Sequence, residues 1–324
     1  MGSLIEVINT QAEANNKLRG EKKKKTSFWA SETEAMAFDI YHKWIGTPPT
    51  NPMQGETVMM LTMRSMTEKA VVSLMRKANV LVKRFANDER VFIEWGPNKV
   101  PISGYPDAGV WIDGQTAIVE IKTYYGQHNH IQVTGGKVRS SYLKQLAIYL
   151  YHFKIQHGIL FMINQGTGEM TEFDLYQNPE NPYHFICPDN EVEINLLETF
   201  QRFERIYVDN ILAGKEPAIE YVYKYPVKTL DWDSLSSADI SAARNGRKVI
   251  GDWQVKYSDY KDLIIQRQGT VPGYTPDELE LIFEKTRGYS ARGKTGFIKF
   301  EESDEGEGDS GPAVTVPLKP LIIR

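Results

Sequence analysis

The 324-residue sequence contains a single cysteine, Cys187, which limits the kinds of disulfide and metal site that the protein can form. One thiol excludes an intrachain disulfide and any metal site built from cysteines alone, and it favours a reducing compartment. The sequence has no apolar run of about 18 residues or more, so it predicts no transmembrane helix. Its polar start, which leads into Lys22–Lys25, predicts no cleavable signal peptide. We therefore expect a cytoplasmic protein with no membrane partner.

The sequence also lacks an excess of basic charge, because its formal net charge is -4. The segment Glu301–Asp309 holds six of the 42 acidic residues and no basic residue, which leaves 36 acidic against 38 basic residues elsewhere. The rest of the chain is thus close to neutral. Any surface that binds nucleic acid must be a local groove and not a globally basic face.

Composition divides the chain into four regions. Residues 1–25 form a polar, Lys-rich arm, which we interpret as a solvated segment, with contact to phosphates as the alternative. Residues 26–225 form the predicted core, and 226–300 form a helical C-terminal region. Residues 301–324 form an acidic tail that we expect to be disordered and that could recruit a protein partner.

Within the core, hydrophobic periodicity and turn residues predict an alternation of helices and strands. Residues 26–81 are predicted to be largely helical. The predicted strands are 90–95, 105–112, 115–124, 158–163 and 170–175, a Gly- and His-containing loop covers 126–136, and the predicted helices are 140–156, 191–212, 237–243, 258–266 and 276–285. This order predicts an α/β fold with a mixed sheet flanked by helices.

The most informative segment runs from Gly104 to Lys122, where Asp113-Gly114 predicts a two-residue type I′ hairpin turn. Such a turn fixes the register and places Asp107 opposite Glu120, with Lys122 on the same face. The other face is apolar throughout and should belong to the core; its residues are Ala108, Val110, Ile112, Ala117, Val119 and Ile121. The face that carries Asp107 should therefore line a surface or cleft.

Two carboxylates that face each other on a sheet destabilise it unless a cation lies between them. Mg²⁺ fits such a pair because it accepts one or two carboxylates and keeps several waters. Asp107 and Glu120 are thus candidate metal ligands, and Lys122 could orient an attacking water and offset phosphate charge. The alternative is a solvated hairpin face with ordinary surface residues.

Pro106-Asp107 together with Glu120-Ile121-Lys122 resembles the signature of the PD-(D/E)XK nucleases. The Q-x-x-x-Y motif of their RecB-like branch matches Gln145 and Tyr149. The resemblance implies a restriction-endonuclease-like core and a Mg²⁺- or Mn²⁺-dependent DNase. It also implies that the backbone of Ile121 is a further metal ligand.

The helix that follows the hairpin carries a polar and aromatic stripe formed by Tyr142, Gln145, Tyr149 and His152. The resemblance implies that Gln145 and Tyr149 lie beside the active site and help to hold DNA, with Tyr142 as a further contact. The alternative is a helix whose tyrosines only pack. Three nearby basic residues could contact phosphates or could simply be exposed; they are Lys137, Arg139 and Lys144. His128 and His130 are weaker candidates as metal ligands.

The resemblance also implies a contribution from an upstream helix, where Glu68 shares a helical face with Val71 and Val72. Glu68 would add a third acidic contact to the metal, directly or through water. Thr67 stands where many members of the family carry His, which puts a second metal ion in doubt. The alternative role of Glu68 is an ion pair with Arg64, four residues earlier.

The likeness extends to small phage and CRISPR-associated exonucleases that carry a four-cysteine iron–sulfur cluster. The frame of their cysteine region matches Ser31-Glu32 with Met36, and Asp252–Ile264, without cysteines. The ligand positions correspond to Met36, Val255, Ser258 and Ile264. We therefore expect no iron–sulfur cluster and expect that packing of the C-terminal helices replaces it.

The resulting hypothesis is an exonuclease that acts on single-stranded or resected DNA, for example in phage replication or recombination. Two alternatives stay open: a non-catalytic DNA-binding or assembly partner that retains the fold, and a structure-specific endonuclease.

Overall fold

The computed structural model describes residues 7, 9–11, 13–14, 24–83, 90–249, 251–269, 273–287, 289–291 and 297–299. Most of the predicted Lys-rich arm and the whole predicted acidic tail lie outside the described residues. The chain divides into two compact units. Unit 1 comprises Met1–Tyr223 and Gly251–Thr270, and unit 2 comprises Lys224–Ile250 and Val271–Arg324. The predicted C-terminal region 226–300 is therefore shared between the two units.

Unit 1 is built on a seven-stranded mixed sheet with the order β10-β9-β8-β7-β6-β5-β2. The strands are β2 (Leu81–Lys83), β5 (Ala108–Ile112), β6 (Gln115–Tyr124), β7 (His157–Asn164), β8 (Met170–Asn178), β9 (Asn181–Cys187) and β10 (Val192–Asn195). Strands β6 and β7 are parallel, and every other neighbouring pair is antiparallel. With helices on its faces, this sheet confirms the predicted α/β class.

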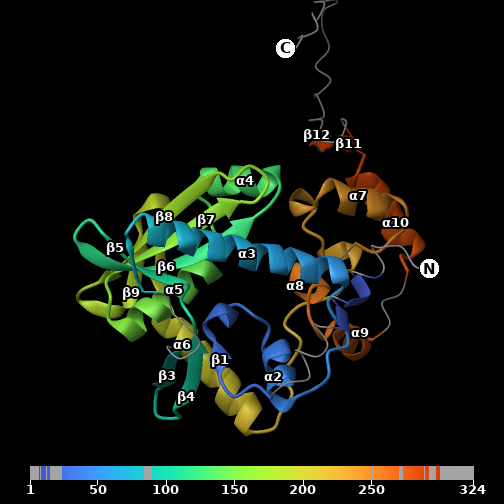
Figure 1. The fold of residues 1–324 in the computed structure, drawn as a ribbon. Helices are drawn as coiled ribbons and strands as arrows, with labels where there is room; N and C mark the ends of the chain where they lie inside the picture. The colour runs from blue at the N-terminus through green and yellow to red at the C-terminus, as the bar shows by residue number, and fades with distance from the viewer. Residues whose placement is uncertain are drawn as a thin grey trace, which may run out of the picture. The chain divides into compact units, whose positions relative to one another are not determined.

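Helices cover both faces of the sheet. The 23-residue helix α3 (Gly55–Lys77) runs across one face (Figure 1), where Val72 joins the apolar side of the β5–β6 hairpin in one cluster. The other face packs against α5 (Ser140–Phe153) and α6 (Leu196–Ile206) in the larger apolar cluster. The prediction that this second face lines a surface or cleft is wrong for Ile118 and Glu120 of β6, which are 1% and 3% exposed. The reason is that α5 packs over this side of β6.

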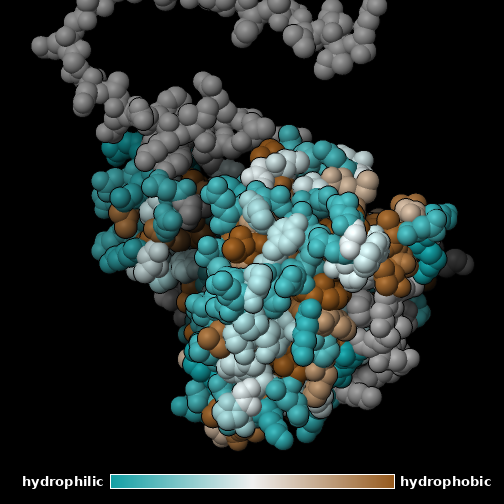
Figure 2. Space-filling model, turned by 90° about the vertical axis from the view of Figure 1, so that its left-hand side faces the viewer, coloured by the Kyte–Doolittle hydropathy of each residue, from teal (hydrophilic) through white to brown (hydrophobic). Residues whose placement is uncertain are grey.

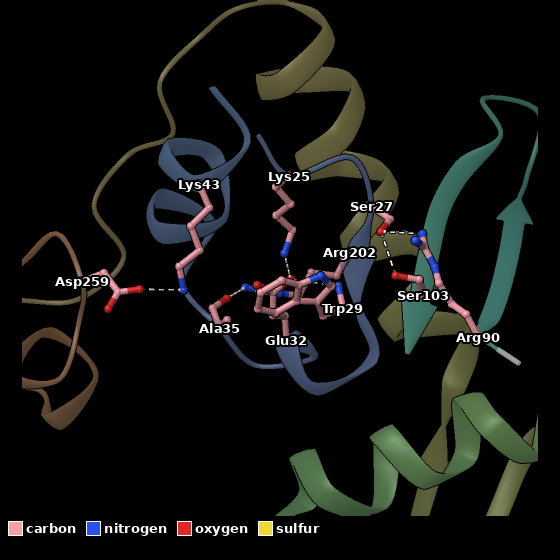
Figure 3. A network of polar contacts seen from close by, with 10 residues as sticks. All are labelled: Lys25, Ser27, Trp29, Glu32, Ala35, Lys43, Arg90, Ser103, Arg202 and Asp259. Atoms are coloured by element: carbon pink, nitrogen blue, oxygen red, sulfur yellow. Dashed lines mark hydrogen bonds and ion pairs between the residues drawn. The ribbon is translucent and has the colours of Figure 1, made fainter. Parts of the chain in front are cut away.

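A second sheet, of order β1-β4-β3, belongs to the same unit. It comprises β1 (Phe28–Trp29), β3 (Val91–Trp95) and β4 (Val100–Gly104), and the short helices η1 (Ala30–Glu32) and α2 (Ala37–Ile45) follow β1. The helical prediction for residues 26–36 is therefore wrong. Figure 3 shows the polar contacts here: Ser27 and Ser103 are hydrogen-bonded at 2.7 Å between Oγ atoms, and Lys25 forms a buried ion pair with Glu32. These contacts join residues 25–32 to one another and to β4.

Three further sequence predictions need correction. The loop expected at 126–136 contains helix α4 (Gln127–Thr134). The helix expected from 191 begins at Leu196, where the Asn195 side chain accepts a hydrogen bond from the Leu197 N–H at 3.2 Å, and it continues as a π-helical turn, η3 (Tyr207–Leu212). The helix expected at 258–266 begins three residues later, as α9 (Lys261–Gln268), and a separate short helix, α8 (Trp253–Lys256), precedes it.

Helices α8 and α9 pack beside α2 through the positions that match the cysteine frame. Met36, Val255 and Ile264 are buried in one apolar cluster. Ser258 is also buried, and its Oγ donates a hydrogen bond to Asp39 Oδ1 at 2.7 Å. Three of the four positions thus pack in an apolar cluster, and the fourth, Ser258, makes hydrogen bonds to Asp39 and to the Tyr260 N–H.

Unit 2 contains α7 (Ser237–Arg244) and α10 (Pro276–Lys285), with the short helices η4 (Val227–Thr229) and η5 (Trp232–Ser234). Its apolar centre includes Val227, Ala243, Val249 and Ile282. Strands β11 (Tyr289–Ala291) and β12 (Phe297–Lys299) form a separate antiparallel pair. The helical predictions for 237–243 and 276–285 agree with α7 and α10.

Among the described residues, no helix combines the length and apolar character needed to cross a membrane. On the face that Figure 2 shows, apolar residues lie in small patches among hydrophilic ones. This mixture is ordinary for a folded protein surface.

Gly158 allows α5 to approach β7 closely. A Cβ atom at this position would lie 2.9 Å from both Leu146 Cγ and Leu150 Cδ1. We expect Gly158→Val to lower the free energy of unfolding by about 1 to 3 kcal/mol through overpacking, as measured by urea denaturation. Gly273→Val is the matched control, because a Cβ there meets no atom within 4 Å, and it should change stability by less than about 0.5 kcal/mol. Equal effects of the two substitutions would contradict this packing argument.

Candidate active site

The β5–β6 hairpin has the register that the sequence predicts. Ile112 pairs with Gln115 and Ala108 pairs with Val119. The turn residues Asp113 and Gly114 have φ values of 49° and 79°, the positive values that a type I′ turn requires. Asp107 directly precedes β5, and the register directs it towards β6.

The Asp107 side chain binds the β6 backbone next to Glu120. Its Oδ2 atom accepts a hydrogen bond from the Ile121 N–H at 2.7 Å. Burial raises the pKa of Asp107, while the Ile121 N–H and the Lys122 ammonium oppose the increase. The hydrogen bond fixes one carboxylate oxygen.

Glu120 is the most buried acidic group of the site, with a 3% exposed side chain. Its Oε1 atom accepts hydrogen bonds from Lys122 Nζ at 2.6 Å and from Gln145 Nε2 at 2.8 Å. Its Oε2 atom is buried and has no hydrogen-bond partner. Burial, and then the charge of Asp107, raise the pKa of Glu120 to about 8, although Lys122 opposes this shift. The unpartnered oxygen leaves Glu120 open to a further positive group.

Helix α5 contacts the Glu120 carboxylate through Gln145. Gln145 Nε2 also donates a hydrogen bond to the Tyr149 hydroxyl at 2.9 Å. The Tyr149 ring lies against Gly104, where a Cβ atom would come within 2.7 Å of Tyr149 Cε1. Gln145 and Tyr149 are 6% and 2% exposed, so in this structure they position Glu120 and present little surface of their own.

Glu68 reaches the site from α3 and is half-buried. Burial, and then the charge of Asp107, raise its pKa, whereas Lys122 and Arg64 lower it. Among the described residues, no ion pair joins Glu68 to Arg64, so the alternative role as a helix-surface pair is not observed. The neighbouring Thr67, which stands where many members of the family carry His, accepts a hydrogen bond from Gln165 Nε2 at 3.4 Å.

Lys122 is the cation of the site. Burial lowers its pKa, but the neighbouring Glu120 charge and hydrogen bond outweigh burial and raise it. The side chain is 22% exposed, so its ammonium stands between the buried Glu120 and solvent. It is therefore placed to meet a ligand that enters from outside.

The donor set suits a small, hard cation held by few protein ligands. Within the described ranges, no group of three or more His, Cys, Asp or Glu side chains is close enough to hold a metal ion. The acidic pair Asp107 and Glu120 nevertheless fits Mg²⁺ or Mn²⁺, because such ions bind through one or two carboxylates and keep waters, and because Glu120 Oε2 is unpartnered.

The other predicted DNA-contacting residues lie between α4 and α5 or in the first turns of α5. The Lys122 ammonium lies 5.2 Å from the centre of the Tyr142 ring. Arg139 and Lys137 are exposed, and Lys144 pairs with Glu34 at 2.8 Å.

The histidines of α4 take other roles. His130 lies 3.6 Å from Glu169 and 3.4 Å from the Tyr124 hydroxyl, and His128 is exposed. Trp253 has no predicted role beyond its place in the cysteine frame, yet its ring contacts Arg139.

Comparisons with known proteins add structural likenesses. No protein-family model and no curated protein matches the sequence. The crystal structure of a protein named SSO0001 is similar over 83% of this chain and 99% of its own, at 14% identity and a TM-score of 0.46. The alkaline exonuclease LHK-Exo from Laribacter hongkongensis covers 63% of this chain and 98% of its own, at 15% identity and a TM-score of 0.33. The structure of LHK-Exo in complex with dAMP is similar at 13% identity and a TM-score of 0.32. The site above rests on the geometry of this chain alone.

Proposed function

We propose that this chain is a Mg²⁺- or Mn²⁺-dependent deoxyribonuclease whose active centre comprises Asp107, Glu120 and Lys122. The observation that carries the proposal is the buried Glu120 carboxylate, which has an unpartnered oxygen and a pKa raised by burial and by the charge of Asp107. A divalent cation relieves this repulsion and supplies the missing partner. Asp107 and Glu120 both lie beside one ammonium, that of Lys122, so the ionised pair keeps an excess of negative charge that an arrangement made only for stability would avoid.

In this proposal Asp107 and Glu120 hold the metal ion, with the Ile121 backbone and Glu68 as further ligands, direct or through water. When bound, the ion supplies positive charge and Lewis acidity beside the scissile phosphate. Lys122 orients the attacking water with its partly exposed ammonium and offsets charge on the phosphate. Gln145 holds Glu120 in place at 2.8 Å, and Tyr149 in turn holds Gln145 at 2.9 Å.

The resemblance in sequence to RecB-like nucleases favours an exonuclease that acts on single-stranded or resected DNA, as in phage replication or recombination. A structure-specific endonuclease would share the same centre. A closed circular substrate separates the two, because an exonuclease leaves it intact.

A second candidate function is a non-catalytic DNA-binding or assembly partner that retains the fold. The observation in its favour is that no cluster of three metal-ligating side chains occurs in the described part of the chain. The paired Asp107 and Glu120 argue against it, because a protein that only binds DNA gains nothing from two buried carboxylates near the anionic backbone.

The proposed activity predicts degradation of end-labelled DNA that requires Mg²⁺ or Mn²⁺ and stops with EDTA. We expect Asp107→Asn to reduce the initial rate at least about 100-fold, because it weakens both metal binding and charge complementarity. Asp113→Asn is the matched control on the same hairpin, since Asn also tolerates the positive φ of this turn position, and it should keep the rate. Purified protein that binds DNA but cuts neither single nor double strands with any metal would contradict the nuclease and favour the binding partner.

A further inference from the structure

A row of alternating cations and aromatic rings leads outward from the candidate active site. The Lys122 ammonium lies 5.2 Å from the centre of the Tyr142 ring, and the Arg139 guanidinium lies 5.9 Å from the same ring. The other ring near Arg139 is that of Trp253, at 5.1 Å. All three distances fall within the usual range of cation–π contacts, roughly 6 Å. The row therefore joins β6, the start of α5 and the start of α8.

Exposure increases along this row. The Lys122 side chain is 22% exposed and Tyr142 is half-buried, whereas Arg139 is exposed and Trp253 is 56% exposed. Its inner end is thus beside the buried Glu120, and its outer end is in solvent. A separate cation–ring pair lies at the end of α8, where Lys256 Nζ lies 5.2 Å from the ring of Tyr257, which is 69% exposed.

Alternating rings and cations match the chemistry of a strand with unpaired bases. Bases stack on aromatic rings, and phosphates pair with Lys and Arg, so one row can bind both parts of a nucleotide. Trp253 has more than half of its surface free, while Arg139 holds its ring in place. Bases inside a duplex are covered by their neighbours and offer no free face, so a row of this chemistry suits an unpaired strand better than a paired one.

We propose that Trp253 is a base-stacking residue at the outer end of a strand-binding track formed with Lys122, Tyr142 and Arg139, and that this track takes a single-stranded nucleic-acid segment. The proposal rests on the proposed nuclease function for its inner end. Trp253 acts as a positioning residue, because it lies outside the carboxylate centre.

The test measures equilibrium binding of the full chain, in EDTA, to a labelled single-stranded oligonucleotide. Trp253→Ala is expected to weaken binding by about 5-fold or more, the effect of losing one base–aromatic stack. Trp253→Phe should restore most of the affinity because it keeps a ring. Trp111→Ala is the matched control: Trp111 has a similar exposure of 55% but lies near the hairpin turn, and its removal should change affinity by less than twofold.

An oligonucleotide with abasic positions separates stacking from phosphate contact. The wild type should prefer the normal strand to the abasic one, and Trp253→Ala should lose this preference. Affinity for a blunt-ended duplex should change little in Trp253→Ala and in Trp253→Phe. If Trp253→Ala keeps both the affinity and the preference for bases, the track is wrong. A protein partner that docks on Trp253 would give this result.

Cleavage assays on the same proteins distinguish this inference from the proposed function. If the wild type cleaves DNA with metal but Trp253→Ala binds the oligonucleotide as well as the wild type, the track is contradicted and the nuclease proposal is supported. Base-dependent binding through Trp253 without any cleavage supports the track and contradicts the nuclease. If the wild type shows neither base-dependent binding nor cleavage, both proposals fail.

Discussion

Lys122→Ala should reduce metal-dependent DNA cleavage by about 100- to 1000-fold, the usual cost of losing one group that stabilises developing charge. Lys122 is the cation in direct contact with Glu120, at 2.6 Å, and its ammonium reaches the partly open side of the site. In the proposed mechanism, its removal leaves the attacking water without a partner and the phosphate charge without an offset. Initial rates on end-labelled single-stranded DNA at saturating Mg²⁺ measure the loss.

Lys43→Ala is the control for this experiment. Lys43 is also a lysine that pairs with a carboxylate, at 3.0 Å from Asp259, and its side chain is 32% exposed against 22% for Lys122. It should change the rate by less than about twofold. Lys122→Arg should recover only part of the activity, because a planar guanidinium does not reproduce the position of the ammonium. A Lys122→Ala protein that cuts within fivefold of wild type would remove Lys122 from the mechanism.

The hairpin could be predicted from the sequence because its geometry is local. Asp113-Gly114 specifies the turn, and the turn specifies every pair from Ala108–Val119 to Ile112–Gln115. The position of Asp107 beside β6 follows from that register without knowledge of the rest of the fold. The alternation of residues also correctly assigned the apolar side, which packs under Val72.

The burial of Glu120 could not be predicted in the same way. Its side of β6 is covered by α5, and the parallel neighbour Leu160 lies 40 positions along the chain. Alternation along one strand identifies two different faces but does not say whether the polar face meets solvent or a second layer. Glu120 is therefore buried in the structure, although the alternation predicts a carboxylate at a surface.

The second sheet was missed for a different reason. Strand β1 is two residues long, and β4 includes Pro101 and ends at Gly104, so neither gives a period-two signal. Val91–Trp95 was recognised as a strand, but nothing local indicates which sheet a strand joins. The start of α6 did carry a signal, because Asn195 is a favoured N-cap residue and makes that contact.

In the absence of metal, Glu120 should make the protein less stable as the pH rises from about 4.5 to about 8. Its pKa is raised from 4.5 to about 8, so over this range the folded protein retains a proton that the unfolded chain releases. The free energy of unfolding must then fall with increasing pH and become level above pH 8. The glutamine of Glu120→Gln is neutral at every pH in this range and has no carboxyl proton to release. The stability of this variant relative to wild type should therefore grow by about 2 to 5 kcal/mol between pH 5 and pH 8.5.

Urea unfolding in EDTA at several pH values measures this difference, and the comparison with Glu120→Gln isolates Glu120 from other titrating groups. Asp39, whose pKa burial raises to about 6, destabilises both proteins equally between pH 4 and 6. Mg²⁺ at pH 8.5 should raise the melting temperature of wild type and not of Glu120→Gln, since binding to the folded state alone stabilises it. A difference between wild type and Glu120→Gln that stays constant from pH 5 to 8.5 would show that Glu120 is not the strained carboxylate on which the metal site depends.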